Sequence, residues 1–367
     1  NAAVLKDRSA PGHAYVQGET IETYRSHMLE RFAVGESDLA ITYTPLHGVG
    51  GEVMTALFRD AGYRRVTTVD RQFAPDPLFP TLPFPNPEEP GALDLAMETA
   101  NASGSSVIIA NDPDADRLGA AVRHDDGWRV LRGDEIGWLL ASALAGEIRL
   151  RGEVVATTIV SSTMLSTLAR EWGVRCATTL TGFKWIARAA GERVLGFGYE
   201  EALGFAVDPL VADKDGLSAA LALARLAHEL SLNGRTLLDQ LDELESKCGV
   251  HATSQLAIRA EGPNELARLH HAVEQLRVAP PRSLGELPVT EVIDLGQGFR
   301  DLPPTEGVWF TLANLGRVVV RPSGTEAKVK AYLEITPARE GSLAEQRARA
   351  AALAHGVRES LDVLLRA

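Results

Sequence analysis

The seven residues from Asn111 to Arg117 read N-D-P-D-A-D-R and follow directly on the apolar run at 107–110. The pattern predicts a buried strand from which three carboxylates at alternate positions converge in a tight loop: Asp112, Asp114 and Asp116. Oxygen ligands suit a hard divalent cation such as Mg²⁺, which prefers carboxylates, water and substrate phosphate. Arg117 adds a fixed cation that can hold a phosphate oxygen through two parallel bonds. The stretch therefore predicts a strand that ends in a magnesium site.

Two other interpretations of this loop compete with a magnesium site. A calcium-binding EF-hand loop shares the D-x-D-x-D pattern, but it needs Gly at its sixth position and Glu at its twelfth. Those positions hold Arg117 and Arg123, and a strand-like run stands where a helix should precede the loop. A solvated acidic turn is the second alternative, and the loop alone leaves it open.

Four further polar loops follow strand-like runs along the chain. One is R-P-S-G-T-E at 321–326, in which an arginine, two hydroxyls and free backbone N–H groups are built like an anion cradle. The others are T-G-F-K at 181–184, Y-E-E-A-L-G at 199–204 and D-K-D-G at 213–216. Open α/β sheets bind ligands at the carboxyl ends of their strands, so these loops are candidate parts of one site.

The five motifs, in this order, resemble those of the α-D-phosphohexomutase superfamily, which includes phosphoglucomutases and phosphomannomutases. Members of the family have four domains, and the first carries a phosphorylated serine in a T-x-S-H-N-P-like loop. This sequence contains no S-H-N-P, and its one Ser-His pair is Ser26-His27. We therefore expect the chain to correspond to domain 2 at 1–130, domain 3 at 131–248 and domain 4 at 249–367, without the phosphoserine domain.

The expected fold is two doubly wound α/β domains with mixed, mostly parallel sheets, followed by a smaller α+β C-terminal domain. Apolar runs alternate with amphipathic segments through the first two domains, which is typical of an α/β fold. The runs predicted as strands lie at 39–43, 65–69, 107–110, 154–160, 177–180 and 194–197. The hydroxyl cluster at 161–163 is predicted to cap the next helix. In the last domain the sequence indicates strands at 317–320 and 329–335 and a helix from 342.

The resemblance implies a role for each candidate site residue. The three aspartates would hold Mg²⁺, Arg117 would stabilise the transferred phosphoryl group, and Glu200 would accept hydrogen bonds from sugar hydroxyls. Ala202 stands where many relatives have a serine. Lys184 and Lys214 resemble substrate-contacting lysines, and either could act as general acid or base if burial lowers its pKa. The distal phosphate would be clamped by four residues: Arg321, Ser323, Gly324 and Thr325.

Composition excludes several classes of function. The chain of 367 residues carries 37 Lys and Arg against 49 Asp and Glu, a net charge of −12, and has no basic cluster. Nucleic-acid binding is therefore not expected. The apolar runs are too short to span a membrane, and the two cysteines lack metal-type spacing, which favours free buried thiols in a reducing cytoplasm. The oligomeric state stays open.

The function implied by the resemblance is that of an intramolecular phosphotransferase of the isomerase class. It would move a phosphoryl group between C1 and C6 of glucose or mannose phosphate, through a phosphoserine and a sugar 1,6-bisphosphate that acts as intermediate and activator. The 367 residues alone would then be inactive. A phosphopentomutase or sugar-bisphosphate synthase of the same superfamily is an alternative. A non-catalytic phosphosugar-binding protein is another, although it would have no use for three metal-binding aspartates.

Overall fold

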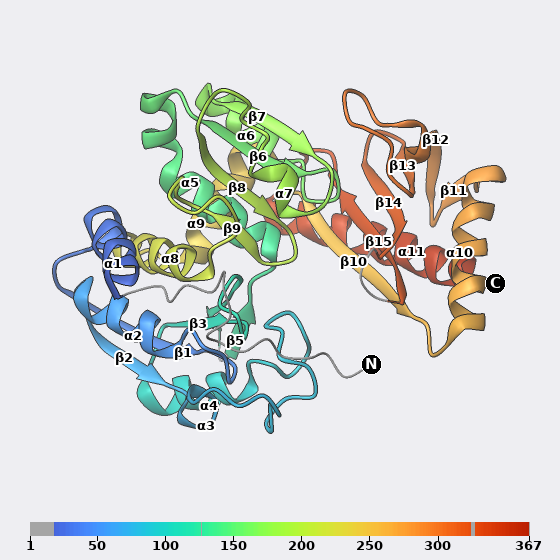
Figure 1. The fold of residues 1–367 in the computed structure, drawn as a ribbon. Coiled ribbons are helices and arrows are strands. Elements are labelled where there is room, and N and C mark those ends of the chain that lie inside the picture. Colours follow the sequence, from blue (N-terminus) through green and yellow to red (C-terminus); the bar gives the residue numbers. More distant parts are fainter. Residues whose placement is uncertain (1–17, 126, 324–326, 367) are drawn as a thin grey trace, which may run out of the picture.

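The chain folds around three β-sheets that follow one another along the sequence (Figure 1). The computed structural model describes residues 18–125, 127–323 and 327–366. Two α/β units come first, drawn in blue to yellow, and the C-terminal unit, in orange to red, lies beside the second of them. This is the expected fold class, with mixed sheets in the first two units.

The first sheet has the strand order β2-β1-β3-β4-β5. Its strands are β1 (Ser37–Thr44), β2 (Tyr63–Thr68), β3 (Val107–Asn111), β4 (Leu118–His124) and β5 (Gly127–Val130). β1 pairs in parallel with β2 and β3, whereas β4 and β5 are antiparallel additions. The helices of this unit are α1 (Gly18–Phe32), α2 (Gly51–Asp60), α3 (Asp70–Phe73) and α4 (Asp94–Ser103). α4 covers one face of the sheet and α2 the other, so the strands are apolar on both sides.

The second sheet is smaller and has the order β7-β6-β8-β9. Its strands are β6 (Val154–Thr158), β7 (Arg175–Thr179), β8 (Leu195–Glu200) and β9 (Gly204–Ala206). β6 is parallel to both of its neighbours, and β9 returns antiparallel to β8. The accompanying helices are α5 (Gly133–Arg151), α6 (Met164–Trp172), α7 (Phe183–Ile186), α8 (Gly216–Ser231) and α9 (Leu237–Cys248).

The helix α8 joins the first two units into one body. Its Ala- and Leu-rich sequence is buried on most sides, and it packs against α5 and β9 as well as against strands of the first sheet. One hydrophobic core consequently runs through both units, from Met54 of α2 to Trp138 of α5 and Phe197 of β8. Asp215 caps the helix by accepting a hydrogen bond from the Leu217 N–H at 3.1 Å.

The C-terminal unit is a six-stranded antiparallel sheet with the order β10-β15-β14-β13-β12-β11. Its elements are β10 (Ala252–Arg259), α10 (Pro263–Val278), β11 (Ser283–Leu284), β12 (Leu287–Asp294), η1 (Leu295–Gln297), β13 (Val308–Leu312), β14 (Gly316–Pro322), β15 (Lys328–Ile335) and α11 (Leu343–Arg366). α10 and α11 cover one face. The other face packs its apolar side chains on residues that follow β6 and β7, such as Val160 and Leu180.

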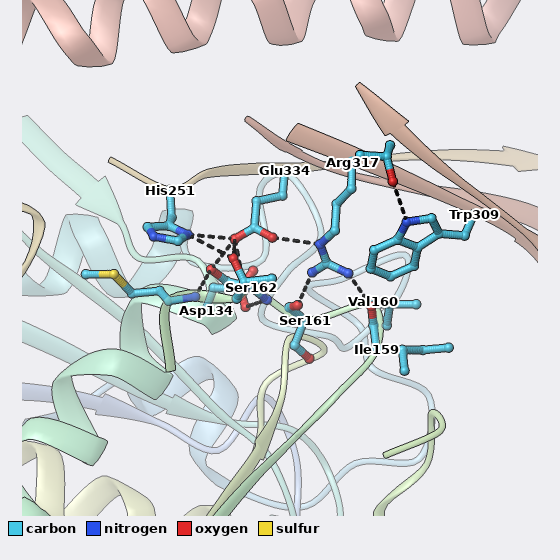
Figure 2. Close-up of polar contacts among 12 residues, drawn as sticks. Asp134, Ile159, Val160, Ser161, Ser162, His251, Trp309, Arg317 and Glu334 are labelled. Atoms are coloured by element: carbon cyan, nitrogen blue, oxygen red, sulfur yellow. Dashed lines mark hydrogen bonds and ion pairs between the residues drawn. The ribbon is translucent and has the colours of Figure 1, made fainter. Parts of the chain in front are cut away.

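A buried polar cluster fixes this sheet to the second unit (Figure 2). Arg317 of β14 donates to the backbone carbonyls of Ile159 and Ser161 and pairs with Glu334 of β15. Glu334 Oε1 accepts from the Ser162 hydroxyl at 2.7 Å and lies 2.9 Å from His251 Nδ1. Because these partners come from two units, the cluster sets how the C-terminal sheet docks.

Several expectations from the sequence need correction here. β6 ends at Thr158, and the residues after it form a loop. The hydroxyls of that loop cap α6 only in part: the Ser162 hydroxyl accepts from the Met164 N–H at 3.0 Å, whereas the N-cap residue Thr163 makes no side-chain capping bond and its hydroxyl donates to Glu334 at 3.0 Å. The C-terminal sheet also has strands that the sequence did not indicate, among them β10, β12 and β13. Their outward positions are polar, so they lack the continuous apolar run of a fully buried strand.

Two smaller observations complete the fold. Cys176 and Cys248 are both free, and each is half-buried rather than fully enclosed. Within the described part of the chain, every helix is too short or too polar to cross a bilayer.

Candidate active site

The metal loop connects β3 to β4 and gathers its three carboxylates in one place. One oxygen from each of Asp112, Asp114 and Asp116 lies within 4.8 Å of the others. Two local hydrogen bonds fold the loop back on itself: the Arg117 N–H donates to Asp112 Oδ1 at 2.9 Å, and the Asn111 amide donates to the Arg117 carbonyl at 2.7 Å. Ala115 takes a left-handed conformation with φ 60°, the kind of strain that functional loops often carry.

Two glycines let neighbouring segments pack directly on the metal loop. A Cβ on Gly48 would lie 2.4 Å from the Pro113 Cα, and the adjacent Val49 N–H donates to the Pro113 carbonyl at 2.9 Å. A Cβ on Gly216 would lie 2.2 Å from the Arg117 carbonyl oxygen. The first turn of α8 and the turn after β1 therefore hold the loop from two sides, and larger residues at either position would displace it.

The electrostatics of the loop suit a divalent cation. The pKa of Asp112 is raised to about 7, chiefly by burial and also by the charges of Asp116 and Asp114, while the Arg117 N–H and guanidinium act in the opposite direction. Three close carboxylates repel one another, and a hard cation is the group that relieves this repulsion through oxygen ligands. The donor set present in the structure thus fits Mg²⁺.

Lys214, from the D-K-D-G loop, reaches this centre. Its ammonium lies 2.8 Å from Asp116 Oδ2 and 3.7 Å from Asp213 Oδ1. Burial acts to lower the pKa of Lys214, but the hydrogen bond and charge of Asp116 outweigh it, so the pKa is raised. The condition set for acid or base chemistry, a pKa lowered by burial, is therefore not met by Lys214 in this arrangement, and its role in proton transfer stays a prediction.

Glu200 stands beside Lys214 at the end of β8. A Cβ on Gly204 would meet both the Glu200 Cγ, at 2.9 Å, and the Lys214 Cδ, at 3.0 Å. Burial raises the pKa of Glu200 to about 7, the charge of Glu201 adds to this, and Lys214 opposes it. The turn that holds Ala202 is tied to the metal loop, because the Leu118 N–H donates to the Leu203 carbonyl at 3.1 Å.

Lys184 is a sequence-predicted residue that the structure does not bring to this cluster. It is the second residue of α7 and is exposed, and its ammonium lies 5.9 Å from the centre of the neighbouring Trp185 ring. In the described ranges it makes no ion pair with the metal loop or with Glu200. A substrate contact by Lys184 stays a prediction.

The phosphate loop begins at the end of β14. Arg321 is half-buried on β14, next to the strand β15 that carries Tyr332. The Ser323 N–H donates to the Lys328 carbonyl at 2.8 Å, which closes the base of the loop. Gly324 and Thr325, two of the four predicted clamp residues, lie outside the described residues, as does Glu326.

A cavity of about 320 Å³ lies at the meeting point of the three units. Residues from the proline-rich crossing at 75–90, the E-E-A-L-G turn and the C-terminal sheet line it, including Glu88, Glu201 and Tyr332. The lining residues run from Pro87 to Leu333, so no local spacing in the sequence links them. Of these three segments, the E-E-A-L-G turn is the one predicted from the sequence as part of the site.

Comparison with known proteins identifies relatives along nearly the whole chain. Family models match residues 22–127 (phosphoglucomutase/phosphomannomutase, alpha/beta/alpha domain II), 132–247 (alpha/beta/alpha domain III) and 282–352 (C-terminal domain). A protein named "Probable phosphomannomutase" from Haemophilus influenzae is 39% identical over 324 residues, with 88% of this chain and 65% of that protein covered. The phosphopentomutase of Homo sapiens is 32% identical, with 88% and 57% covered.

These relatives are longer than the chain, which spans 57% to 65% of the length of the two just described. Among solved structures, a phosphoglucomutase/phosphomannomutase family protein from Burkholderia thailandensis superposes with a TM-score of 0.66. It is 18% identical, and the match covers 96% of this chain and 66% of that one. This likeness concerns the fold, which extends through all three units.

Proposed function

Since the chain belongs to the phosphoglucomutase/phosphomannomutase family of the α-D-phosphohexomutase superfamily, we propose that it forms the metal, sugar and phosphate sites of a phosphohexomutase. The reaction would move a phosphoryl group between C1 and C6 of glucose or mannose phosphate. A phosphoserine would give its phosphoryl group to one sugar hydroxyl, and the serine would recover a phosphoryl group from the other end of the resulting 1,6-bisphosphate.

The single observation that carries this proposal is the convergence of Asp116, Lys214 and Glu200 from three separate loops. Phosphoryl transfer is catalysed mainly by positioning and by stabilisation of charge, and these residues offer both. Mg²⁺ held by Asp112, Asp114 and Asp116 would neutralise charge on the phosphoryl oxygens. Arg117 lies 3.6 Å from Asp112 and 3.7 Å from Asp116, so its guanidinium is held at the same centre.

Lys214 and Glu200 would have different roles, one at the reacting oxygen and the other at the sugar hydroxyls. Because Lys214 keeps its proton, it suits charge stabilisation and proton donation at the reacting oxygen rather than proton abstraction. Glu200 would orient the sugar by accepting hydrogen bonds from its hydroxyls. Arg321 would hold the phosphate that does not react, because guanidinium can make two parallel bonds to a phosphate.

A phosphopentomutase is the second candidate, favoured by relatives named phosphopentomutase and phosphoribomutase at 32% and 36% identity. A coupled assay distinguishes the hexomutase from the phosphopentomutase. It uses protein that carries the phosphoserine, in the presence of Mg²⁺, and supplies glucose 1-phosphate, mannose 1-phosphate or ribose 1-phosphate in turn. Faster turnover of a hexose phosphate supports the proposal, and preference for ribose 1-phosphate replaces it with the second candidate. If the phosphorylated protein binds these compounds but converts none, a non-catalytic binding protein becomes the better account.

A further inference from the structure

The cavity at the meeting point of the three units lies between the sugar acid and the phosphate loop. Glu201, in its wall, directly follows Glu200, and Gly119 lies two residues beyond Arg117. Tyr332, also in its wall, lies on β15, next to the strand β14 that carries Arg321. The cavity therefore adjoins both the turn that follows Glu200 and the strand pair that leads into the phosphate loop.

Glu88 enters the cavity from the crossing before α4 and has no partner for its carboxylate. Its backbone N–H is bonded, to Asn86 Oδ1 at 3.1 Å, but the side chain makes no hydrogen bond or ion pair with any residue of 18–125, 127–323 or 327–366. Glu88 is half-buried, and its pKa is raised to about 7, chiefly by burial and also by the charge of Glu201, while Lys330 and Arg117 act to lower it. Its carboxylate still reaches solvent, and the described residues supply no hydrogen-bond donor for it.

The neighbouring acids, unlike Glu88, each have an ion-pair or hydrogen-bond partner. Glu89 points to the C-terminal sheet, where it pairs with Arg259 at 3.2 Å. Glu201 accepts a hydrogen bond from the Ser161 hydroxyl at 2.8 Å. Glu88 is thus the acid in this wall whose hydrogen-bonding capacity the described residues leave unused, and perturbed acids in cavities are frequent ligand contacts.

The chemistry of the cavity selects a ligand rich in hydroxyl groups. Apolar side chains such as Val160 and Leu203 form part of the wall, and acidic oxygens stand among them. Resting on the proposed function, we propose that Glu88 accepts a hydrogen bond from a hydroxyl of the bound sugar phosphate. Glu88 is then a specificity-determining residue, because a sugar without that hydroxyl leaves the acid unpaired.

The test is a calorimetric titration of this chain with glucose 6-phosphate and, separately, with inorganic phosphate. Glu88→Ala should weaken glucose 6-phosphate about tenfold, the size expected for one lost hydrogen bond to an acid, and leave inorganic phosphate unchanged. Glu88→Gln keeps an acceptor oxygen and should recover most of the affinity. Glu89→Gln is the matched control, since it removes the same charge one residue away and should bind like the wild type.

Deoxy analogues of glucose 6-phosphate identify the hydroxyl. The analogue that lacks the contacted hydroxyl should bind the wild type about tenfold more weakly and bind Glu88→Ala no worse than the parent sugar does. Wild-type affinity for glucose 6-phosphate in Glu88→Ala would overturn the inference and leave the proposed function standing. An equal loss for inorganic phosphate would overturn it too, because the effect would then be on the fold. A wild-type chain that binds inorganic phosphate but no sugar phosphate would overturn the proposed function itself.

Discussion

Arg317 and Glu334, on the adjacent strands β14 and β15, form a buried ion pair with 2.7 Å between Nε and Oε2. Each member also bonds to the loop after β6: the guanidinium donates to two backbone carbonyls there, and the carboxylate accepts from Ser162. The guanidinium further stacks on the Trp309 ring, with 4.8 Å from Cζ to the ring centre. The pair therefore joins the C-terminal sheet to the loop after β6, where the Ser161 hydroxyl in turn donates to Glu201 at 2.8 Å.

Removing Arg317 should destabilise the protein strongly. Arg317→Leu leaves Glu334 as a buried charge without its guanidinium, a change that typically costs about 3–5 kcal/mol. Chemical denaturation of the 367-residue chain measures the loss. Arg366→Leu is the control, because its pair with Asp362 is exposed and should contribute less than about 1 kcal/mol. Equal stability of the two variants would contradict the assigned role of the buried pair.

Acid should weaken the same interface. Burial acts to raise the pKa of Glu334, but the Arg317 charge and the hydrogen bond from His251 outweigh it and hold the pKa far below its usual range. An acid with a depressed pKa contributes stability above its unfolded pKa, about 4.3, and loses it as pH falls toward the folded value. Stability should therefore decline below about pH 4.3. Melting curves of Glu334→Gln should show a shallower decline in that range.

Each aspartate of the metal loop should be required for the metal. Asp114→Ala should abolish Mg²⁺ binding in titration calorimetry and turnover in the phosphorylated enzyme, because three carboxylates share the ion. Asp114 is exposed, so the melting temperature should change little. Asp38→Ala, an exposed acid at the start of β1, serves as the control and should bind Mg²⁺ normally. Normal turnover of Asp114→Ala would remove the metal assignment.

Arg321 should contribute most of the binding affinity for the distal phosphate. Two charge-assisted bonds contribute about 1.5–3 kcal/mol each, so Arg321→Ala should weaken binding of glucose 1,6-bisphosphate by tenfold to over a hundredfold. Arg321→Lys should recover only part of this, since an ammonium lacks the planar fork. Arg282→Ala, the control, removes an exposed arginine of the same unit and should leave the affinity for glucose 1,6-bisphosphate unchanged. Unchanged affinity in Arg321→Ala would place the phosphate site elsewhere.

The 367 residues by themselves should bind a sugar phosphate without converting it. The sequence holds no S-H-N-P loop, and the proposed cycle starts from a phosphoserine. A sensitive check is the exchange of label between glucose 1-phosphate and glucose 6-phosphate, with Arg321→Ala protein prepared in parallel to reveal contaminating host enzyme. Conversion by the wild-type chain alone would require a different phosphoryl donor.

The sequence by itself determined the parts of the site that are local. The spacing of Asp112, Asp114 and Asp116 after a buried run predicted the metal loop, because alternate residues of a tight turn after one strand must lie close together. The apolar runs predicted most strands of the first two sheets. These features depend on neighbours within a few residues, whose geometry the backbone fixes.

Only the tertiary structure decided what depends on distant residues. The hydroxyls before α6 were predicted to cap it, and the Ser162 hydroxyl does accept from the Met164 N–H, but Ser162 and Thr163 also donate to Glu334, about 170 residues further along the chain. Whether burial lowers the pKa of Lys214 was open from the sequence, and Asp116 of another loop raises that pKa in spite of burial. No sequence motif pointed to Glu88, because the residues around its cavity come from all three units. Burial and charge are properties of the whole assembled chain, so a pattern along the sequence can place an acid or a lysine without fixing its partner or its pKa.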